Sequence, residues 1–300
     1  MPAAVVTRDI HKHYGRTRAV DGVSIEIETG EFYGFLGPNG AGKTTTLEII
    51  EGLRKPDSGE VSLLGLPPWP RNEALLPRIG VQFQTSSFFE RLTAREQLRT
   101  FAALYRVRGR AADDLLEAFG LAEAAGTRTE RLSGGQAQRL SIACALVHSP
   151  EVVVLDEPTA GLDPQARHNL WDLLREINAQ GRTVILSTHY LDEAELLCDR
   201  VSIMDGGKIL RTGPAATLIA EYNAPTRVSV EVRAISLDEA GKLFPDATLD
   251  EQAGVLTITT HDPSAVVSEL GRRHALAGLA VRGASLEDVF LAVTGREYRS

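Results

Sequence analysis

The feature that most constrains the fold is a glycine-rich run directly after a short apolar segment. Residues 31–36 have the composition of a buried strand, and the chain continues Gly37-Pro38-Asn39-Gly40-Ala41-Gly42-Lys43-Thr44. The pattern GxxxxGK[ST], set between a strand and a helix, is a P-loop whose backbone amides surround phosphate groups. Thr45 and the apolar residues after it begin the expected helix. The sequence therefore predicts a strand–loop–helix unit that binds a nucleoside triphosphate.

Phosphoryl transfer requires a protein mainly to position phosphates and to neutralise their charge. Lys43 would supply a positive charge, and the hydroxyl of Thr44 can ligate Mg²⁺. The apolar run 152–155 predicts a second buried strand that ends at Asp156, followed by Glu157. We expect Asp156 to face Mg²⁺ beside Thr44, and Glu157 to accept the proton of an attacking water. Taken alone, two adjacent carboxylates are equally typical of solvent-facing charge.

A second glycine-rich turn lies between these two motifs. Ser133, Gly134 and Gly135 precede the helix that starts with Gln136. Exposed amides at a helix N-terminus form a ready anion site, although glycine turns before helices are common in themselves.

Leu132–Gln136, followed by Ala137-Gln138-Arg139, resembles the signature sequence of the ATP-binding cassette (ABC) proteins. The resemblance covers residues 5 to about 215. It implies ATP and Mg²⁺ as cofactors, and a second copy of the chain as partner. In that family the signature of one subunit covers the γ-phosphate held by the P-loop of the other, so ATP would lie between two head-to-tail copies.

Four further positions match the family. Gln84 resembles the glutamine that touches Mg²⁺ and the attacking water. The segment Ala160-Gly161-Leu162-Asp163 resembles the loop that crosses to the partner subunit, with Asp163 as its binding residue. His189 resembles the switch histidine at the γ-phosphate; without the resemblance, a structural role would be the simpler reading. Tyr14 resembles the aromatic residue that stacks on adenine, with core packing as the alternative.

Alternating strand and helix patterns predict an α/β fold: a P-loop NTPase cassette of the ABC type, with a mixed, mainly parallel sheet and a helical lobe at about 85–148. Nucleotide would bind at the carboxyl ends of the strands. The expected strands are 3–9, 23–28, 31–36, 79–83, 152–156, 183–187 and 200–204. We place the cassette at 1–221 and a small α+β domain of ferredoxin-like order at 222–300.

Composition limits the kinds of partner and the cellular location that can be expected. The net charge of −8 offers no general basic surface, so no nucleic acid is expected. No run of about 18 apolar residues predicts a membrane span, and the N-terminus does not resemble a secretory signal. Two cysteines inside helical patterns fit a reducing compartment. We therefore expect a cytoplasmic protein, peripheral on the inner face of the cell membrane, whose permease is a separate chain.

Within the ABC family, one cassette without heptads between Lys43 and Ser133 argues against the translation-factor and chromosome-maintenance branches. Residues 187–195 and 286–295 resemble drug-resistance exporters of the daunorubicin type. The resemblance implies a homodimeric, transport-coupled ATPase that exports drug-like or hydrophobic compounds. An importer, an exporter of lipid, polysaccharide or ions, and a soluble ATPase acting on nucleic acid or ribosomes are the alternatives.

Two roles are left open by the sequence. Residues 85–95 are expected to transmit closure to the permease, and Phe88 and Phe89 fit either a groove for a permease helix or the buried core. The C-terminal domain fits either a widened dimer contact or a regulatory role.

Overall fold

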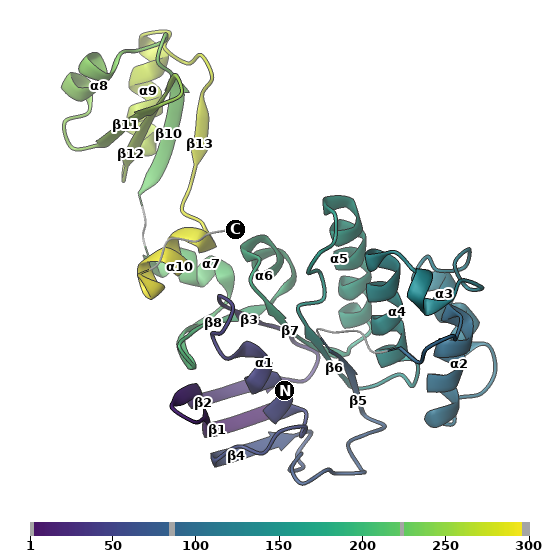
Figure 1. Ribbon diagram of the computed structural model, residues 1–300. Coiled ribbons are helices and arrows are strands. Elements are labelled where there is room, and N and C mark those ends of the chain that lie inside the picture. Colours follow the sequence, from purple (N-terminus) through teal and green to yellow (C-terminus); the bar gives the residue numbers. More distant parts are fainter. Residues whose placement is uncertain (1–2, 84–87, 223–224, 296–300) are drawn as a thin grey trace. The chain divides into compact units, whose positions relative to one another are not determined.

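The computed structural model describes residues 3–83, 88–222 and 225–295 (Figure 1). The chain divides into two compact units, Met1–Ala215 and Ala216–Ser300. The division falls at the start of helix α7 (Ala215–Tyr222), whereas the sequence placed the boundary at the end of the same helix. This helix itself was not predicted.

The first unit contains an antiparallel sheet in the order β2-β1-β4. Strands β1 (Ala3–Tyr14) and β2 (Thr17–Glu28) form a hairpin that pairs Tyr14 with Thr17, so both are longer than predicted. Strand β4 (Ser58–Leu63) was missed because its sequence lacks an apolar run; pairing with β1 makes it a strand.

A six-stranded sheet forms the centre of this unit. Its strands, in spatial order, are β5 (Ile79–Gln82), β6 (Val152–Asp156), β7 (Thr183–Thr188), β3 (Phe32–Leu36), β8 (Arg200–Asp205) and β9 (Lys208–Gly213). All pairs are parallel except β8–β9, a hairpin the sequence did not predict. Every residue of β3, β6 and β7 is buried, as expected for parallel strands covered on both faces.

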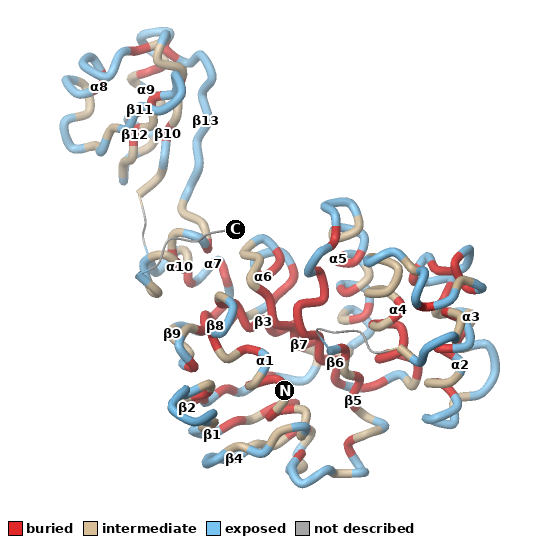
Figure 2. Tube along the Cα trace, viewed as in Figure 1, coloured by how far each residue is buried: buried red, intermediate tan, exposed pale blue. Residues whose placement is uncertain are grey.

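Helix α1 (Lys43–Ile50) lies between the two sheets. Alternate residues of β3, Tyr33 and Phe35, join a core cluster with Leu47 and Ile49 of α1. The buried strands at the centre of this unit are red in Figure 2. The other face of β3 meets α6 (Leu191–Leu197): a Cβ on Gly34 would lie 2.6 Å from the sulfur of Cys198. Helix α5 (Pro164–Ala179) packs on β7. Helix α1 and the loop before it are thereby fixed at the centre of the unit.

The helical lobe consists of α2 (Ala94–Leu104), α3 (Ala111–Ala118) and α4 (Gly134–Leu146), with a short 3₁₀ turn, η1 (Thr129–Arg131), before α4. Helix α2 begins with a capping box: the Glu96 amide donates to the Thr93 hydroxyl at 3.3 Å, and the Thr93 amide donates to Glu96 at 2.9 Å. The three helices pack on one another, and α4 also packs on β5 and β6.

The second unit has its own sheet, β11-β12-β10-β13, in which every neighbouring pair is antiparallel. Along the chain its elements are β10 (Thr226–Glu231), α8 (Leu237–Leu243), β11 (Thr248–Gln252), β12 (Val255–Thr260), α9 (Pro263–Arg272), β13 (Ala280–Arg282) and α10 (Leu286–Thr294). This is the predicted ferredoxin-like order. Strand β11 was not predicted because its residues are mostly polar and exposed. The fully buried Val228, Val230, Leu256 and Ile258 centre a separate core.

Candidate nucleotide site

The loop Gly37–Thr44 joins the end of β3 to the first turn of α1. Gly42 has a φ of 104°, and a Cβ there would lie 2.2 Å from the carbonyl oxygen of Ala19, so only glycine fits. In the part of the chain that the structure describes, the amides of Lys43, Thr44 and Thr45 have no hydrogen-bond acceptor. Unpaired amides at the positive end of a helix fit a phosphate group.

The ammonium group of Lys43 lies inside this loop. Its Nζ donates to the carbonyl oxygens of Gly37 at 2.7 Å and Pro38 at 3.2 Å, and lies 3.3 Å from Oε1 of Glu157. Burial lowers the pKa of Lys43, and the Glu157 carboxylate opposes that effect. The lysine is thus held at the loop by groups with which an anionic phosphate would compete.

Asp156 ends strand β6 and contacts two hydroxyl groups. Its carboxylate accepts hydrogen bonds from Ser187 and Thr44. Burial raises the pKa of Asp156, while these two hydrogen bonds lower it. Carboxylate and hydroxyl oxygens are the hard donors that Mg²⁺ prefers. Two of the three predicted magnesium ligands therefore lie together and fit the ion; the third, Gln84, lies outside the described residues.

Glu157 adopts a left-handed backbone conformation with φ 49°. Such a conformation is unfavourable for a residue with a side chain and is found preferentially at functional sites. The Glu157 amide donates to the Ser187 hydroxyl at 3.0 Å, and Oε1 lies 3.5 Å from Nδ1 of His189. The nearby His189 is the main factor that lowers the pKa of Glu157, against the effect of burial, and Lys43 contributes further. The carboxylate is kept ionised, as a general base requires.

The strand order explains why these groups meet. Asp156 is in register with Ser187 across β6–β7, and Leu36, just before the loop, is in register with Thr188 across β7–β3. The loop, Asp156, Glu157 and His189 thus lie at one edge of the sheet, where three parallel strands end. Ser187 was missed by the sequence reasoning. Its only signal was its position at the end of a predicted strand. The sequence does not show which strand lies beside it, so the contact with Asp156 could not be predicted.

The second glycine-rich turn does not join this group within the chain. Ser133 is the N-cap of α4: its hydroxyl accepts from the Gln136 amide at 3.2 Å, and the Gln136 side chain accepts from the Ser133 amide at 3.0 Å. Across the described ranges, no hydrogen bond or ion pair connects residues 133–136 with residues 37–44. The amides of Gly134 and Gly135 therefore begin a separate helix.

Asp163 caps α5 in the same way, since its carboxylate accepts from the Ala166 amide at 2.9 Å. A Cβ on Gly135 would lie 3.6 Å from the Leu162 side chain. The signature-like turn and the loop 160–163 are therefore neighbours, and the predicted site residues fall into two groups.

Tyr14, at the tip of the β1–β2 hairpin, is 43% exposed. The guanidinium carbon of Arg54 lies 5.3 Å from its ring centroid. The exposed ring is not a core residue, which removes the packing alternative; stacking on adenine stays a prediction.

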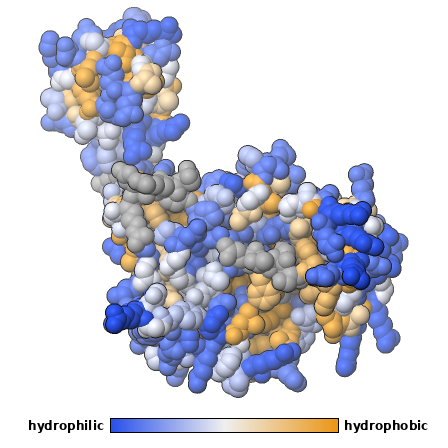
Figure 3. Space-filling model, in the orientation of Figure 1, coloured by the Kyte–Doolittle hydropathy of each residue, from blue (hydrophilic) through white to orange (hydrophobic). Residues whose placement is uncertain are grey.

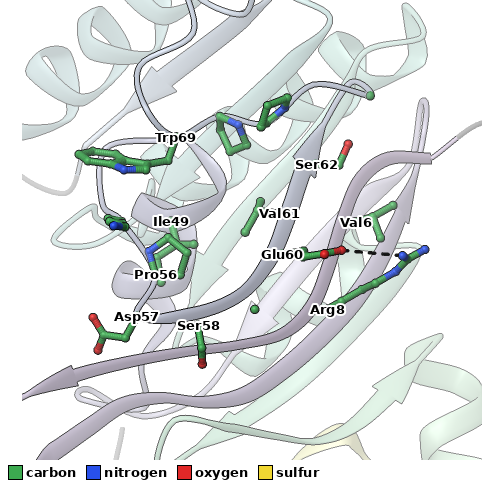
Figure 4. A pocket seen from close by; sticks show the side chains of 15 residues that line it. Val6, Arg8, Ile49, Pro56, Asp57, Ser58, Glu60, Val61, Ser62 and Trp69 are labelled. Atoms are coloured by element: carbon green, nitrogen blue, oxygen red, sulfur yellow. Dashed lines mark ion pairs between the residues drawn. The ribbon is translucent and has the colours of Figure 1, made fainter.

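A hollow of about 700 Å³ lies elsewhere, on the side of β1 and β4 (Figure 4). Val6, Val61 and Trp69 line it, with an Arg8–Glu60 ion pair of 4.0 Å at its edge. It includes Ile49, near the end of α1, whereas the phosphate-binding loop precedes the start of that helix. None of the predicted site residues lines this hollow.

The fold and the site together define a P-loop nucleotide-binding protein with a helical lobe inserted between the loop and the aspartate strand. Residues 20–160 match the family described as ABC transporter. The Nod factor export ATP-binding protein I of Burkholderia orbicola (strain AU 1054) is 40% identical over 300 residues, covering 98% of each chain. The daunorubicin resistance ATP-binding protein DrrA3 of Streptomyces coeruleorubidus is 37% identical, covering 99% of this chain and 97% of that protein. The chain belongs to the ABC transporter family.

Solved structures agree with this assignment. A structure described as the ATP binding subunit of an ABC transporter has a TM-score of 0.67 and 30% identity, covering 79% of this chain and 97% of its own. The dimeric cassette MJ0796 has a TM-score of 0.63 and 30% identity, covering 70% of this chain and 98% of its own. The predicted cassette fold is thereby confirmed. None of the helices in the described ranges has the length and apolar composition needed to span a bilayer.

Proposed function

We propose that this chain is the ATP-hydrolysing motor subunit of an exporter, and that it works as a dimer with a separate permease at the cytoplasmic face of the cell membrane. The observation that carries the proposal is the contact of Lys43, Glu157 and His189 beside the paired Thr44 and Asp156. Bound Mg²⁺ would neutralise phosphate charge. Glu157, held ionised, accepts the proton of a water, and His189 and Lys43 orient the carboxylate and the phosphate.

The separation of the two groups of site residues supports a dimer. In the described ranges, residues 133–136 begin helix α4 without a hydrogen bond or ion pair to their own P-loop, and the relative MJ0796 is described as dimeric. In a head-to-tail pair, the turn of one copy would complete the phosphate site of the other. Charge-assisted hydrogen bonds of roughly 1.5–3 kcal/mol each would then link the copies until hydrolysis removes them.

Export is supported by the names of the relatives, one of Nod factor export and one of daunorubicin resistance. We propose drug-like or hydrophobic compounds as cargo. Nothing in the nucleotide site distinguishes among such cargoes, so the permease would select them.

The test of catalysis and dimerisation is Glu157→Gln, which keeps the size of the side chain but cannot accept the proton. We expect ATP turnover to fall by at least about a hundredfold. Light scattering after size exclusion should show a stable dimer with ATP and a monomer without it. Wild-type turnover in this variant would contradict the assignment of Glu157.

Ser133→Arg is the companion variant for the in-trans site. Alone, it should abolish ATP turnover. In the Glu157→Gln background it should abolish the ATP-dependent dimer, because the arginine would fill the space expected for the partner's phosphate. ATP binding to the monomer, measured by calorimetry, should change little. If monomer binding were lost as well, the turn would act within its own chain.

The surface beside β5 supports permease docking. Phe83 and Phe89, which flank the undescribed residues 84–87, are 50% and 52% exposed. Apolar surface is visible around that segment in Figure 3. The Phe89 amide donates to the Gln97 side chain at 3.1 Å, so the backbone that carries the exposed Phe89 ring is held in place by helix α2. Phe88 is half-buried, whereas Phe89 is not in the core.

A further inference from the structure

The turn that carries His189 is held by a row of stacked side chains. The rings of His189 and Tyr190 have centroids 4.1 Å apart at 37°. The guanidinium carbon of Arg167 lies 4.0 Å from the centroid of Tyr190, within the range of a strong cation–π contact. With His189 3.5 Å from Glu157, the row runs from the proposed base to helix α5.

Arg167 has few other partners. Its side chain is 20% exposed, and its Nε is buried without a hydrogen-bond acceptor in the described part of the chain. The nearest carboxylate, Asp192, is 3.8 Å away and largely exposed, and a screened pair of that kind contributes little. The face of Tyr190 is therefore the main contact of this guanidinium.

Helix α5 connects this row to the loop 160–163. Asp163 is the N-cap, and the Arg167 amide donates to the carbonyl oxygen of Asp163 at 3.0 Å, one turn later. A movement of the loop that tilts the first turn of α5 would therefore move Arg167.

A second contact fixes the same two segments. One turn beyond Arg167, Nε1 of Trp171 donates at 3.1 Å to Glu193, which is fully buried in α6. Burial raises the pKa of Glu193, and the hydrogen bond from Trp171 opposes the shift. Tyr190 is the N-cap of α6 and Glu193 lies in its first turn, so the Arg167–Tyr190 and Trp171–Glu193 contacts both hold the start of α6 against α5.

We propose that Arg167 is a positioning residue: by stacking on Tyr190 it sets the orientation of His189 toward Glu157, and it makes that orientation depend on the loop 160–163. This inference rests on the proposed dimer, in which the loop meets the second copy. Binding of the partner at Asp163 would then change the orientation of His189 in the same chain, and hydrolysis would start only after the two copies have bound each other.

The test uses the full-length protein and separates turnover from binding. Arg167→Ala and Tyr190→Ala should each lower kcat by about tenfold, because His189 loses its support. The affinity for ATP, measured calorimetrically in the Glu157→Gln background, should change by less than about twofold, because the phosphate-binding loop is untouched. Tyr190→Phe keeps the ring and should retain wild-type kcat.

Two variants exclude simpler explanations. Arg175→Ala removes another α5–α6 contact, the 3.1 Å hydrogen bond to the Leu196 carbonyl, without touching the row. Asp192→Asn removes only the ion pair of Arg167. Both should keep wild-type kcat; an equal loss in either would overturn the role of the stacking.

The dependence on the loop is tested by a double-mutant cycle. The double variant Arg167→Ala/Asp163→Ala should lose no more turnover than the more damaging single variant, since both substitutions break the same chain of contacts from the loop to His189. Additive losses would overturn the coupling. Failure of the Glu157→Gln dimer would instead refute the proposed two-copy function, and a lowered kcat in Arg167→Ala would then reflect positioning within one chain.

Discussion

Through a single hydroxyl group, Ser187 connects the Asp156 carboxylate with the backbone of Glu157. It donates to Asp156 and accepts from the amide of Glu157, and it is fully buried. A residue of the neighbouring strand therefore orients the Asp156 carboxylate, lowers its pKa and holds the backbone amide of Glu157. A buried group that loses its partner costs about 1–3 kcal/mol.

For this reason we expect Ser187→Ala to raise the Mg²⁺ concentration for half-maximal ATP turnover by roughly tenfold. ATP binding without Mg²⁺ should change little, because Lys43 and the loop are unaffected. The measurement is a magnesium titration of initial rates. Ser202→Ala is the matched control: Ser202 is a fully buried hydroxyl in β8, hydrogen-bonded to Thr212 at 2.7 Å. An equal magnesium effect there would show a general loss of packing instead.

Residue types at this site were predictable because phosphate chemistry demands them. Gly42, Lys43 and Asp156 stand in patterns that few other structures require. The stacking of Arg167 on Tyr190 was not predictable, since an arginine on a helix is ordinarily a solvated charge and its partner is 23 positions away (190 − 167 = 23).

At the scale of elements, His148 connects the helical lobe to the central sheet. It follows α4, its Nε2 donates to the carbonyl oxygen of Ile79 in β5 at 2.9 Å, and its ring stacks 3.8 Å from Tyr105 at the end of α2. Burial lowers the pKa of His148, partly opposed by the hydrogen bond to Ile79. The neutral ring is thus the form that the fold prefers.

The sign of the pH effect follows. A histidine whose pKa is lowered by folding stabilises the protein above its unfolded pKa of about 6.5, and that stability is lost as the pH falls below it. We expect the free energy of unfolding in urea to fall more steeply between pH of about 7 and about 5.5 in the wild type than in His148→Gln. His168→Gln, at an exposed position, should keep the wild-type slope. Equal slopes in all three proteins would contradict the role of His148.

Elements with a strong apolar pattern were predicted well: the fully apolar run 152–155 marked the buried parallel strand β6. The strands β4, β9 and β11 escaped because their residues are mostly exposed or half-buried and form no apolar run; all three are edge strands of their sheets. Edge strands are stabilised by pairing with one neighbour, so their own residues carry a weak signal.

At the scale of the whole molecule, the two units have separate cores. Leu256 is fully buried among Val228, Val230 and Ile258, and no residue of this cluster belongs to the first unit. Leu256→Ala should lower the stability of the second unit by about 2–5 kcal/mol. ATP affinity, measured by calorimetry well below the unfolding temperature, should remain that of the wild type. A parallel loss of ATP affinity would mean that the C-terminal unit supports the nucleotide site.

The proposed assembly gives the last prediction. Phe89→Glu should abolish co-sedimentation with membranes that contain a co-expressed permease, because a charge would replace an apolar docking side chain. The ATPase activity of the isolated chain should be unchanged. Leu196→Glu is the control, since Leu196 on α6 is exposed to the same 52%. Membrane retention of Phe89→Glu at the wild-type level would place the permease contact elsewhere.

The sequence by itself determined the nucleotide chemistry, because a P-loop, a strand-end aspartate with its glutamate and a signature-like turn need particular residues at short spacings. It also determined the mainly parallel sheet and the ferredoxin-like order of the second unit through hydrophobic periodicity. Only the tertiary structure decided which strand ends are neighbours, and so placed the Ser187 hydroxyl between the Asp156 carboxylate and the Glu157 amide. It alone set Arg167 against Tyr190 and separated the turn at 133–136 from the P-loop of its own chain. The physical reason is that motifs are local in sequence, whereas strand order and side-chain stacking arise from contacts between distant segments.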